Sequence, residues 1–212
     1  MPNEFDAAAT SNRCNVTVNF SQVNLLEKAS AISQAVDNPS GICWGLAFVW
    51  MEYKAKNAYN KFFQDVNAWE DKATTLKAAG LYGIVQMKSN KLELAASNCG
   101  LTIAKDKEGD IKQKYGLSTS DEKDMKTLAN WMSAAMGERF FFIETGGHAM
   151  AASGSKTLNL EFFDPNFGVV SVWNAGNMAG FFTDFFKQQR IRNAYWRSSY
   201  RYDLKVTKFK RK

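Results

Sequence analysis

The pattern of apolar and polar residues predicts helices in the first part of the chain. From Val23 to Val36, apolar residues recur at helical spacing, which indicates a first helix. The run from Asp37 to Gly41 contains proline and glycine and separates that helix from the next element. Helix formers then dominate from Ile42 to about Phe63, so we expect a long helix that begins near Cys43.

The middle of the chain, from about Asn67 to Met136, is more polar and is expected to be largely helical. The stretch from Ser120 to Lys123 has the composition of a helix start. In the helix that follows, Leu128, Trp131 and Met132 lie on one face. The rest of this middle part carries no motif that points to a function.

The pattern changes from Arg139 onward. Short apolar runs are separated by Gly, Ser, Asn and Pro at hairpin distances, which is typical of antiparallel strands. We expect strands at 140–143, 149–152, 158–163, 169–173 and around 200–209, and a helix from about 177 to 189. A helical first half packed on an antiparallel second half predicts an α+β domain.

Length and composition set the expected domain organisation. With 212 residues, 45% of them hydrophobic, the chain can build one domain with a sizeable core. Residues 1–20 are polar and mixed and are expected to form a loosely held N-terminal arm, whereas residues 21–212 form a single domain with a basic C-terminal segment. No apolar run approaches the roughly 18 to 20 residues of a membrane span, and the acidic N-terminus does not resemble a Sec signal peptide.

The net charge of +6 is concentrated at the end of the chain. The segment from Lys187 to Lys212 holds ten of the 27 basic residues and only one acidic residue. Such a segment suits contact with an acidic protein surface or an anionic membrane, and the residues expected to make this contact are Arg190, Arg192, Arg197, Arg201 and Lys205. The alternative is an ordinary strand with aromatic residues inward and basic residues outward. Nucleic-acid binding is not expected as the main function.

The cysteine content indicates free thiols. Cys14, Cys43 and Cys99 are too few and too scattered for a disulfide framework. Their odd number leaves at least one thiol unpaired, which suits a reducing compartment. With one histidine and no Cys-x-x-Cys pair, no metal site and no cofactor is expected.

Cys43 lies where a loop turns into an apolar helix. A thiol attacks as its thiolate, and the unpaired N–H groups and positive dipole of a helix start lower its pKa. Gly41 and Gly45 leave room for a substrate backbone beside the sulfur. The alternative is a buried, inert cysteine, which is the state that we expect for Cys14 and Cys99.

His148 lies in a Gly-Gly-His-Ala sequence and is the only histidine, so any neutral-pH imidazole chemistry depends on it. Asp164 follows sixteen positions later, and a hairpin between the two brings the ends of adjacent strands together. The carboxylate is then expected to accept a hydrogen bond from Nδ1–H and to leave Nε2 facing the thiol. The alternatives are a histidine without a catalytic role and an aspartate that starts a turn before Pro165.

An oxyanion that develops on a substrate needs fixed hydrogen-bond donors. The backbone N–H of Cys43 is one candidate, and the side chain of Asn38, five residues upstream, is another. Asn38 before Pro39 is equally well explained as the start of a turn.

Three motifs in order, Asn-x-x-Gly-x-Cys-x-Gly-Leu, Gly-Gly-His-Ala and Phe-Phe-Asp-Pro-Asn-Phe-Gly, resemble the YopT/AvrPphB family. Its members are papain-like cysteine proteases that bacterial pathogens deliver into host cells. The resemblance implies a papain-like fold with Cys43 as nucleophile, His148 as general base, Asp164 as orienting residue and Asn38 in the oxyanion hole. The spacings of 105 residues from Cys43 to His148 and of 16 from His148 to Asp164 are of the size that the family implies.

The resemblance also implies a virulence function, as an effector or toxin that cleaves a protein in the cytoplasm of a target cell. Secretion by a non-Sec route is expected, and a myristoylation signal is not, because Pro2 follows Met1. A glutamine deamidase or an acyltransferase is the alternative, since both use the same thiolate and thioester intermediate. A non-catalytic binding module is the less favoured class.

Overall fold

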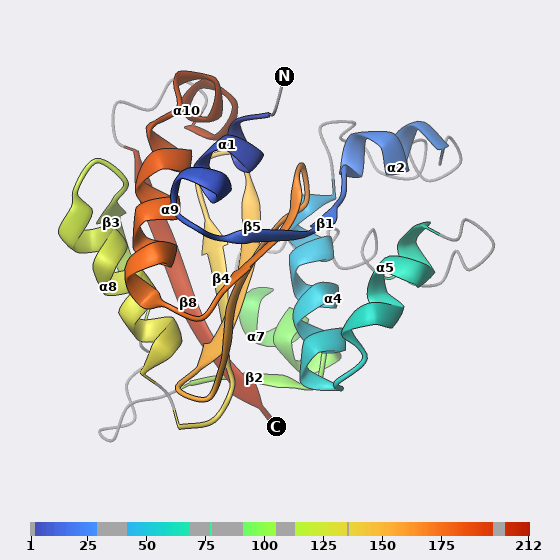
Figure 1. The fold of residues 1–212 in the computed structure, drawn as a ribbon. Helices are drawn as coiled ribbons and strands as arrows, with labels where there is room; N and C mark the ends of the chain where they lie inside the picture. The colour runs from blue at the N-terminus through green and yellow to red at the C-terminus, as the bar shows by residue number, and fades with distance from the viewer. Residues whose placement is uncertain are drawn as a thin grey trace.

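An antiparallel sheet forms the centre of the protein, as the computed structural model in Figure 1 shows. The structure describes residues 3–28, 42–67, 77, 91–104, 113–134, 136–196 and 202–212. Within these residues the strands are β1 (Asn15–Asn19), β2 (Leu101–Ile103), β3 (Gln113–Ser118), β4 (Arg139–Glu144), β5 (Ala149–Ser155), β6 (Leu158–Asp164), β7 (Gly168–Val172) and β8 (Asp203–Arg211). They lie in the order β1-β7-β6-β5-β4-β8-β2, and β3 also pairs with β8.

Helices cover both faces of this sheet (Figure 1). The helices are α1 (Glu4–Ser11), α2 (Gln22–Lys28), α4 (Cys43–Ala55), α5 (Tyr59–Asn67), α7 (Lys91–Asn98), α8 (Glu122–Ser133), α9 (Ala175–Lys187) and α10 (Gln189–Trp196). One hydrophobic core joins α4, α5 and α7 to one face of the sheet, and a second core joins α1, α8, α9 and α10 to the other.

The central strands are apolar on both faces because each contributes to both cores. Along β4, Phe140 and Phe142 belong to the core that contains α4, whereas Phe141 and Ile143 belong to the core that contains α9. This alternation follows from the two-residue period of a strand. It explains why these segments are continuously hydrophobic although their strands are antiparallel.

The element predictions for the second half are confirmed. The four strands expected between residues 140 and 173 are β4 to β7, the helix expected at 177–189 is α9, and the last strand is β8. Helix α8 starts where the sequence predicts, and the side chain of Asp121 caps it by accepting a hydrogen bond from the N–H of Lys123. The expected first helix is observed as α2 up to Lys28, and its remainder lies outside the described residues.

The prediction of one long helix to Phe63 is wrong, because α4 ends at Ala55 and α5 follows. Asn57 adopts a left-handed backbone with φ of 56°. The N–H of Asn57 donates to the carbonyl of Lys54, and that of Ala58 donates to the carbonyl of Tyr53. This is the Schellman arrangement that ends helices, with asparagine at the position that usually holds glycine.

The middle of the chain is not purely helical, since β2 and β3 lie in the part that we expected to be helical. Both strands pair with β8, about 85 to 110 residues further along the chain. Strand β2 has only three residues, and β3 is mostly polar and contains a glycine, so neither carries a periodic signal of its own and both depend on the distant partner.

Residues 4–19 also differ from the loose arm that the composition suggests. Helix α1 is capped by Asn3, whose side chain accepts a hydrogen bond from the N–H of Asp6, and β1 pairs with β7 at one edge of the described sheet. Phe5 is 0% exposed and packs between helix α9 and the sheet. One large apolar side chain and a short paired strand therefore tie this polar segment to the fold.

Candidate active site

Cys43 is the first residue of α4, as the sequence predicts. Helix α4 is buried along most of its length, so packing fixes its direction, and its first residue lies against His148, which precedes β5. The first N–H groups of a helix have no partner within it, and they concentrate positive potential around the first side chain. Cys43 itself is half-buried, whereas Cys14 and Cys99 are buried.

The hairpin of β5 and β6 brings His148 and Asp164 together. Nε2 of His148 lies 2.9 Å from Oδ1 of Asp164, and the two residues are 7% and 0% exposed. His148 precedes β5 in a tight loop, where its N–H donates to Oγ1 of Thr145 over 2.9 Å. The predicted proximity of the ends of two antiparallel strands is thus observed.

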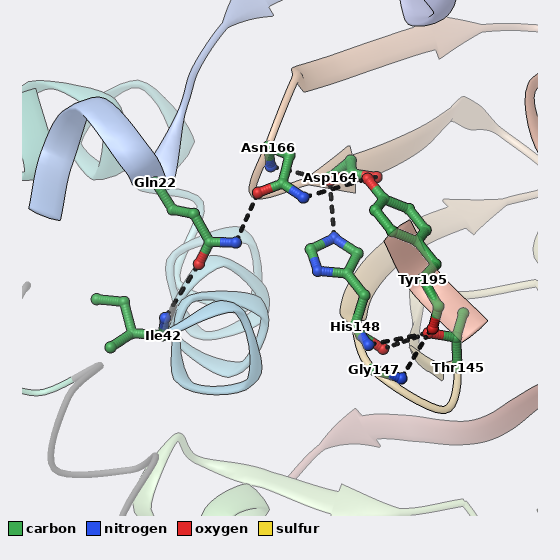
Figure 2. A network of polar contacts seen from close by, with 8 residues as sticks. All are labelled: Gln22, Ile42, Thr145, Gly147, His148, Asp164, Asn166 and Tyr195. Atoms are coloured by element: carbon green, nitrogen blue, oxygen red, sulfur yellow. Dashed lines mark hydrogen bonds and ion pairs between the residues drawn. The ribbon is translucent and has the colours of Figure 1, made fainter. Parts of the chain in front are cut away.

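The orientation of the imidazole is the reverse of the one expected. Nε2, rather than Nδ1, faces the carboxylate (Figure 2). The nitrogen left for the sulfur of Cys43 is therefore Nδ1. Sequence spacing places the two residues side by side, but the ring rotation depends on the direction from which the loop enters the site.

Electrostatics favour a thiolate and an imidazolium. Burial alone raises the pKa of the Cys43 thiol, but the charge of His148, its hydrogen bond to the sulfur and the backbone N–H of Ala149 outweigh burial, and the net pKa is lowered. Burial opposes the charged form of His148, yet Asp164 and Cys43 together raise its pKa to about 10. Each group therefore stabilises the charged form of the other.

The net pKa shift of the other two thiols is upward, because no imidazole offsets their burial. Burial raises the pKa of Cys14 to about 11 and, together with the charge of Glu52, that of Cys99 to about 12. Both therefore stay protonated near neutral pH, as expected for inert core cysteines.

Asp164 is both a turn residue and the partner of His148. Its carbonyl accepts a hydrogen bond from the N–H of Phe167, and its Oδ1 also accepts one from the N–H of Asn166 over 2.9 Å. Gly168 ends the turn with φ of 120°, where a Cβ atom would collide with the carbonyl of Val18. The Asp-Pro-Asn-Phe-Gly motif is therefore the sequence of a tight turn that aims a buried carboxylate at the imidazole.

Tyr195, on α10, completes the surroundings of Asp164 and was not singled out by the sequence. Its hydroxyl donates to Oδ2 of Asp164 over 2.7 Å, and its ring packs on His148 with the ring centroids 4.1 Å apart. Its carbonyl accepts hydrogen bonds from Oγ1 of Thr145 and from the N–H of Gly147 (Figure 2). The sequence showed only one aromatic residue among several in a basic segment.

Gln22 is a second residue that the sequence did not indicate. It lies on α2, and its side chain contacts Ile42 just before the cysteine and Asn166 just after the aspartate (Figure 2). The only signal that pointed to this region was the Asn in the Asp-Pro-Asn motif.

Three of the predicted residues lie outside the part of the chain that the structure describes. They are Asn38, Arg197 and Arg201.

The basic residues expected to contact a partner surface make contacts within the molecule instead. Arg190 pairs with Glu4 at 3.3 Å. The side chain of Arg192 donates to the carbonyl of Phe186 and lies over the ring of Tyr202. The Nζ atom of Lys205 lies 3.8 Å from a carboxylate oxygen of Glu144. These contacts within the molecule give no support to a role in membrane binding.

A hollow of about 460 Å³ opens beside the His148 loop. Its lining includes Thr145 and Gly146 from that loop, together with the charged residues Glu144, Asp203 and Lys205. Within the described residues, no three His, Cys, Asp or Glu side chains are grouped to hold a metal ion. Nor is any helix in the described part of the chain both long and apolar enough to span a membrane.

A thiol activated by an imidazole, at the start of a buried helix and against an antiparallel sheet, is the arrangement of the papain-like cysteine peptidases. The chain belongs to the Peptidase C58 family, because the model of that family, described as Yersinia/Haemophilus virulence surface antigen, matches residues 11–212. It is therefore a cysteine-type peptidase of a family of virulence proteins. A comparison with curated proteins finds no match.

Two solved structures share the fold at low sequence identity. The Pseudomonas avirulence protein AvrPphB is 12% identical with a TM-score of 0.60, and the match covers 80% of this chain and 91% of that one. PatoxP, a cysteine protease-like domain of the Photorhabdus asymbiotica toxin PaTox, is 14% identical with a TM-score of 0.51, and the match covers 88% of this chain and 54% of that one. The predicted α+β, papain-like fold is confirmed.

Proposed function

We propose that Cys43, His148 and Asp164 form the catalytic triad with which this peptidase cleaves a protein of a target cell. The observation that carries this proposal is the placement of the three residues: Cys43 is the first residue of α4, and Nε2 of His148 lies 2.9 Å from Oδ1 of Asp164, while the charge of His148 lowers the pKa of the thiol. A structural cysteine has no need of a charged partner, and burial alone raises its pKa, as it does for Cys14.

In the first step, the thiolate of Cys43 attacks the scissile carbonyl carbon and forms a tetrahedral oxyanion. The backbone N–H of Cys43, at the start of α4, is one donor to this oxyanion, and we propose the side chain of Asn38 as the other. His148 then transfers its proton to the leaving nitrogen, the C–N bond breaks and an acyl-thioester remains on Cys43.

In the second step, water completes the hydrolysis. His148, now neutral, takes a proton from a water molecule, whose oxygen attacks the thioester carbon. The C–S bond breaks, the acid product leaves, and the sulfur returns as a thiolate beside a protonated imidazole. Asp164 holds the ring in place in both steps and stabilises its positive charge.

The site of action is a further part of the proposal. The family description names a virulence protein, and the two structural neighbours are titled an avirulence protein and part of a toxin. We propose that the chain is secreted by a non-Sec route and acts on a protein in the cytoplasm of the target cell.

Proteomics of a target-cell lysate tests this function. After incubation with the active chain, we expect new protein N-termini that do not appear with Cys43→Ala, because removing a catalytic nucleophile lowers kcat by roughly 10⁶-fold. Cys14→Ala is the matched control, because Cys14 is a buried thiol away from the triad, and it should retain the cleavage. Mass gains of about 1 Da on glutamines without new N-termini would instead identify a deamidase, and acyl-sized gains an acyltransferase.

A further inference from the structure

Gln22 is only 3% exposed and makes three hydrogen bonds within the protein. Its Oε1 accepts from the N–H of Ile42 over 3.0 Å, and its Nε2 donates to Oδ1 of Asn166 over 2.6 Å. Its own N–H donates to the carbonyl of Pro165 over 2.7 Å. A buried amide with both ends engaged in this way is fixed in one orientation.

The two partners of this amide belong to opposite sides of the site. Ile42 is the residue before Cys43 and occupies the cap position of α4. Asn166 lies in the turn after β6, and its N–H donates to Oδ1 of Asp164, the oxygen that holds His148. One side chain therefore connects the start of the nucleophile helix to the turn that positions the acid (Figure 2).

The direction of each hydrogen bond between the start of α4 and Asp164 follows from which groups can donate and which can accept. The N–H of Ile42 is only a donor, so it requires the oxygen end of Gln22. The amide nitrogen of Asn166 donates to the hydroxyl of Tyr195 over 3.4 Å, which leaves its oxygen to accept from Gln22. The Tyr195 hydroxyl then donates to Asp164, so each hydrogen bond in the series from α4 to Asp164 pairs one donor with one acceptor.

We propose that Gln22 is a positioning residue that holds the thiol of Cys43 and the imidazole of His148 at ion-pair distance, by tying the start of α4 to the Asp164 turn. Gln22 does not need to touch the substrate for this role. The proposal deepens the function given above and rests on it for the identity of the triad.

Losing the hydrogen bonds of the Gln22 side chain is expected to change the pKa values of Cys43 and His148 in a defined direction. Within the part of the chain that the structure describes, the titratable groups that act on the Cys43–His148 pair are its two members and Asp164 from β6, and the phenol of Tyr195 from α10 lies against His148 and Asp164. Glu144, from β4, accepts a hydrogen bond from the indole of Trp44 and lies beside Lys205. If the thiol moves away from the imidazole, the pKa of Cys43 rises and that of His148 falls, so the pH range of the ion pair narrows from both sides.

The experiment is the pH dependence of Cys43 alkylation by iodoacetamide, together with kcat/KM, in Gln22→Met. Methionine keeps the volume of the side chain and removes both amide contacts. We expect the pH at which alkylation sets in to rise by about 1 unit, the size typical when an opposite charge is withdrawn. The pH above which kcat/KM falls is expected to decrease. Gln189→Met is the matched control, because Gln189 also donates to an asparagine side chain, Asn193, but on the exposed face of α10, and it should leave both pH limits unchanged.

A purely structural role gives a different result. In that case, Gln22→Met lowers thermal stability and the amount of active protein but leaves both pH limits where they are, and the proposal is overturned. If Gln22→Met does not fold, Gln22→Asn replaces it, since its shorter amide reaches one partner and not both, and the same direction of shift is expected. The alkylation curve reports on the thiol and imidazole without any peptide substrate, so it tests the tie even if the proposed proteolysis fails.

Discussion

His148 determines how the site behaves as the pH changes. Its ring contacts Asp164 through one nitrogen, packs on the ring of Tyr195 at a tilt of 31° and makes a hydrogen bond with the thiol of Cys43. Because burial opposes its charge and the two anionic partners more than offset that effect, its charged form persists well above the usual range of an imidazole. The thiol titrates below its own usual range for the same reason.

The thiolate–imidazolium pair is therefore expected over a wide pH window. The lowered pKa of Cys43 keeps the thiolate present as the pH falls well below the roughly 8.5 of a free thiol. The raised pKa of His148 keeps the imidazolium present until about pH 10, above which kcat/KM falls. Iodoacetamide labelling at Cys43, followed by peptide mapping across pH, measures the lower pH limit. In His148→Gln the labelling curve should move to a pH above that of an ordinary thiol, because burial of Cys43 and the charge of Asp164 are then no longer offset, and an unchanged curve would refute the ion pair.

The three residues of the proposed triad stand out in the sequence because each has a local signal. Cys43 follows a breaker and opens an apolar helix, His148 is the single imidazole, and Asp164 starts a recognisable turn. The orientation of the imidazole was not predictable, because it depends on a loop held by Thr145 and Tyr195. Gln22 and Tyr195 were missed for a related reason, since their roles come from contacts with residues that are distant in the sequence.

At the level of elements, α10 is the least predictable part of the site. The basic and aromatic residues after Lys187 suggest a docking surface or a strand, whereas residues 189–196 form a helix with Tyr195 and Trp196 buried. The helix reaches the site through the side chain and the carbonyl of Tyr195. The strands of the second half were more predictable, because their two-residue period and the turns between them are local features.

Tyr195→Phe tests the contact by which α10 supports the acid. The substitution keeps the ring on His148 but leaves Oδ2 of the fully buried Asp164 without its donor. We expect the free energy of unfolding to fall by about 1–3 kcal/mol, and kcat to fall with little change in KM. Urea unfolding and steady-state kinetics measure the two effects. Tyr202→Phe is the control, because Tyr202 packs on Trp196 outside the triad, and an equal loss in both variants would argue against a specific role.

The whole molecule is organised around one sheet with a core on each face, and the site lies where elements of both cores meet. Cys43 packs with the core that contains α4, whereas Tyr195 belongs to the core that contains α9. The hydrophobic segments that build these cores were visible in the sequence. The attachment of residues 4–19 was not, because β1 pairs with β7, about 150 residues further along the chain, and a pairing of that separation leaves no local pattern.

Phe5→Ala tests whether this N-terminal attachment supports the site as well as the fold. Phe5 is fully buried and stacks on Phe167 with the ring centroids 5.6 Å apart, and Phe167 lies in the turn that aims Asp164. Removing a buried aromatic ring is expected to cost about 3–5 kcal/mol of unfolding free energy, and a less firmly packed turn should also lower kcat/KM below the unfolding temperature. Trp173→Ala, at a side chain that is 69% exposed, should change neither quantity appreciably. A Phe5→Ala protein with normal stability would show that α1 is not part of the core, and one with reduced stability but normal kcat/KM would confine its role to the fold.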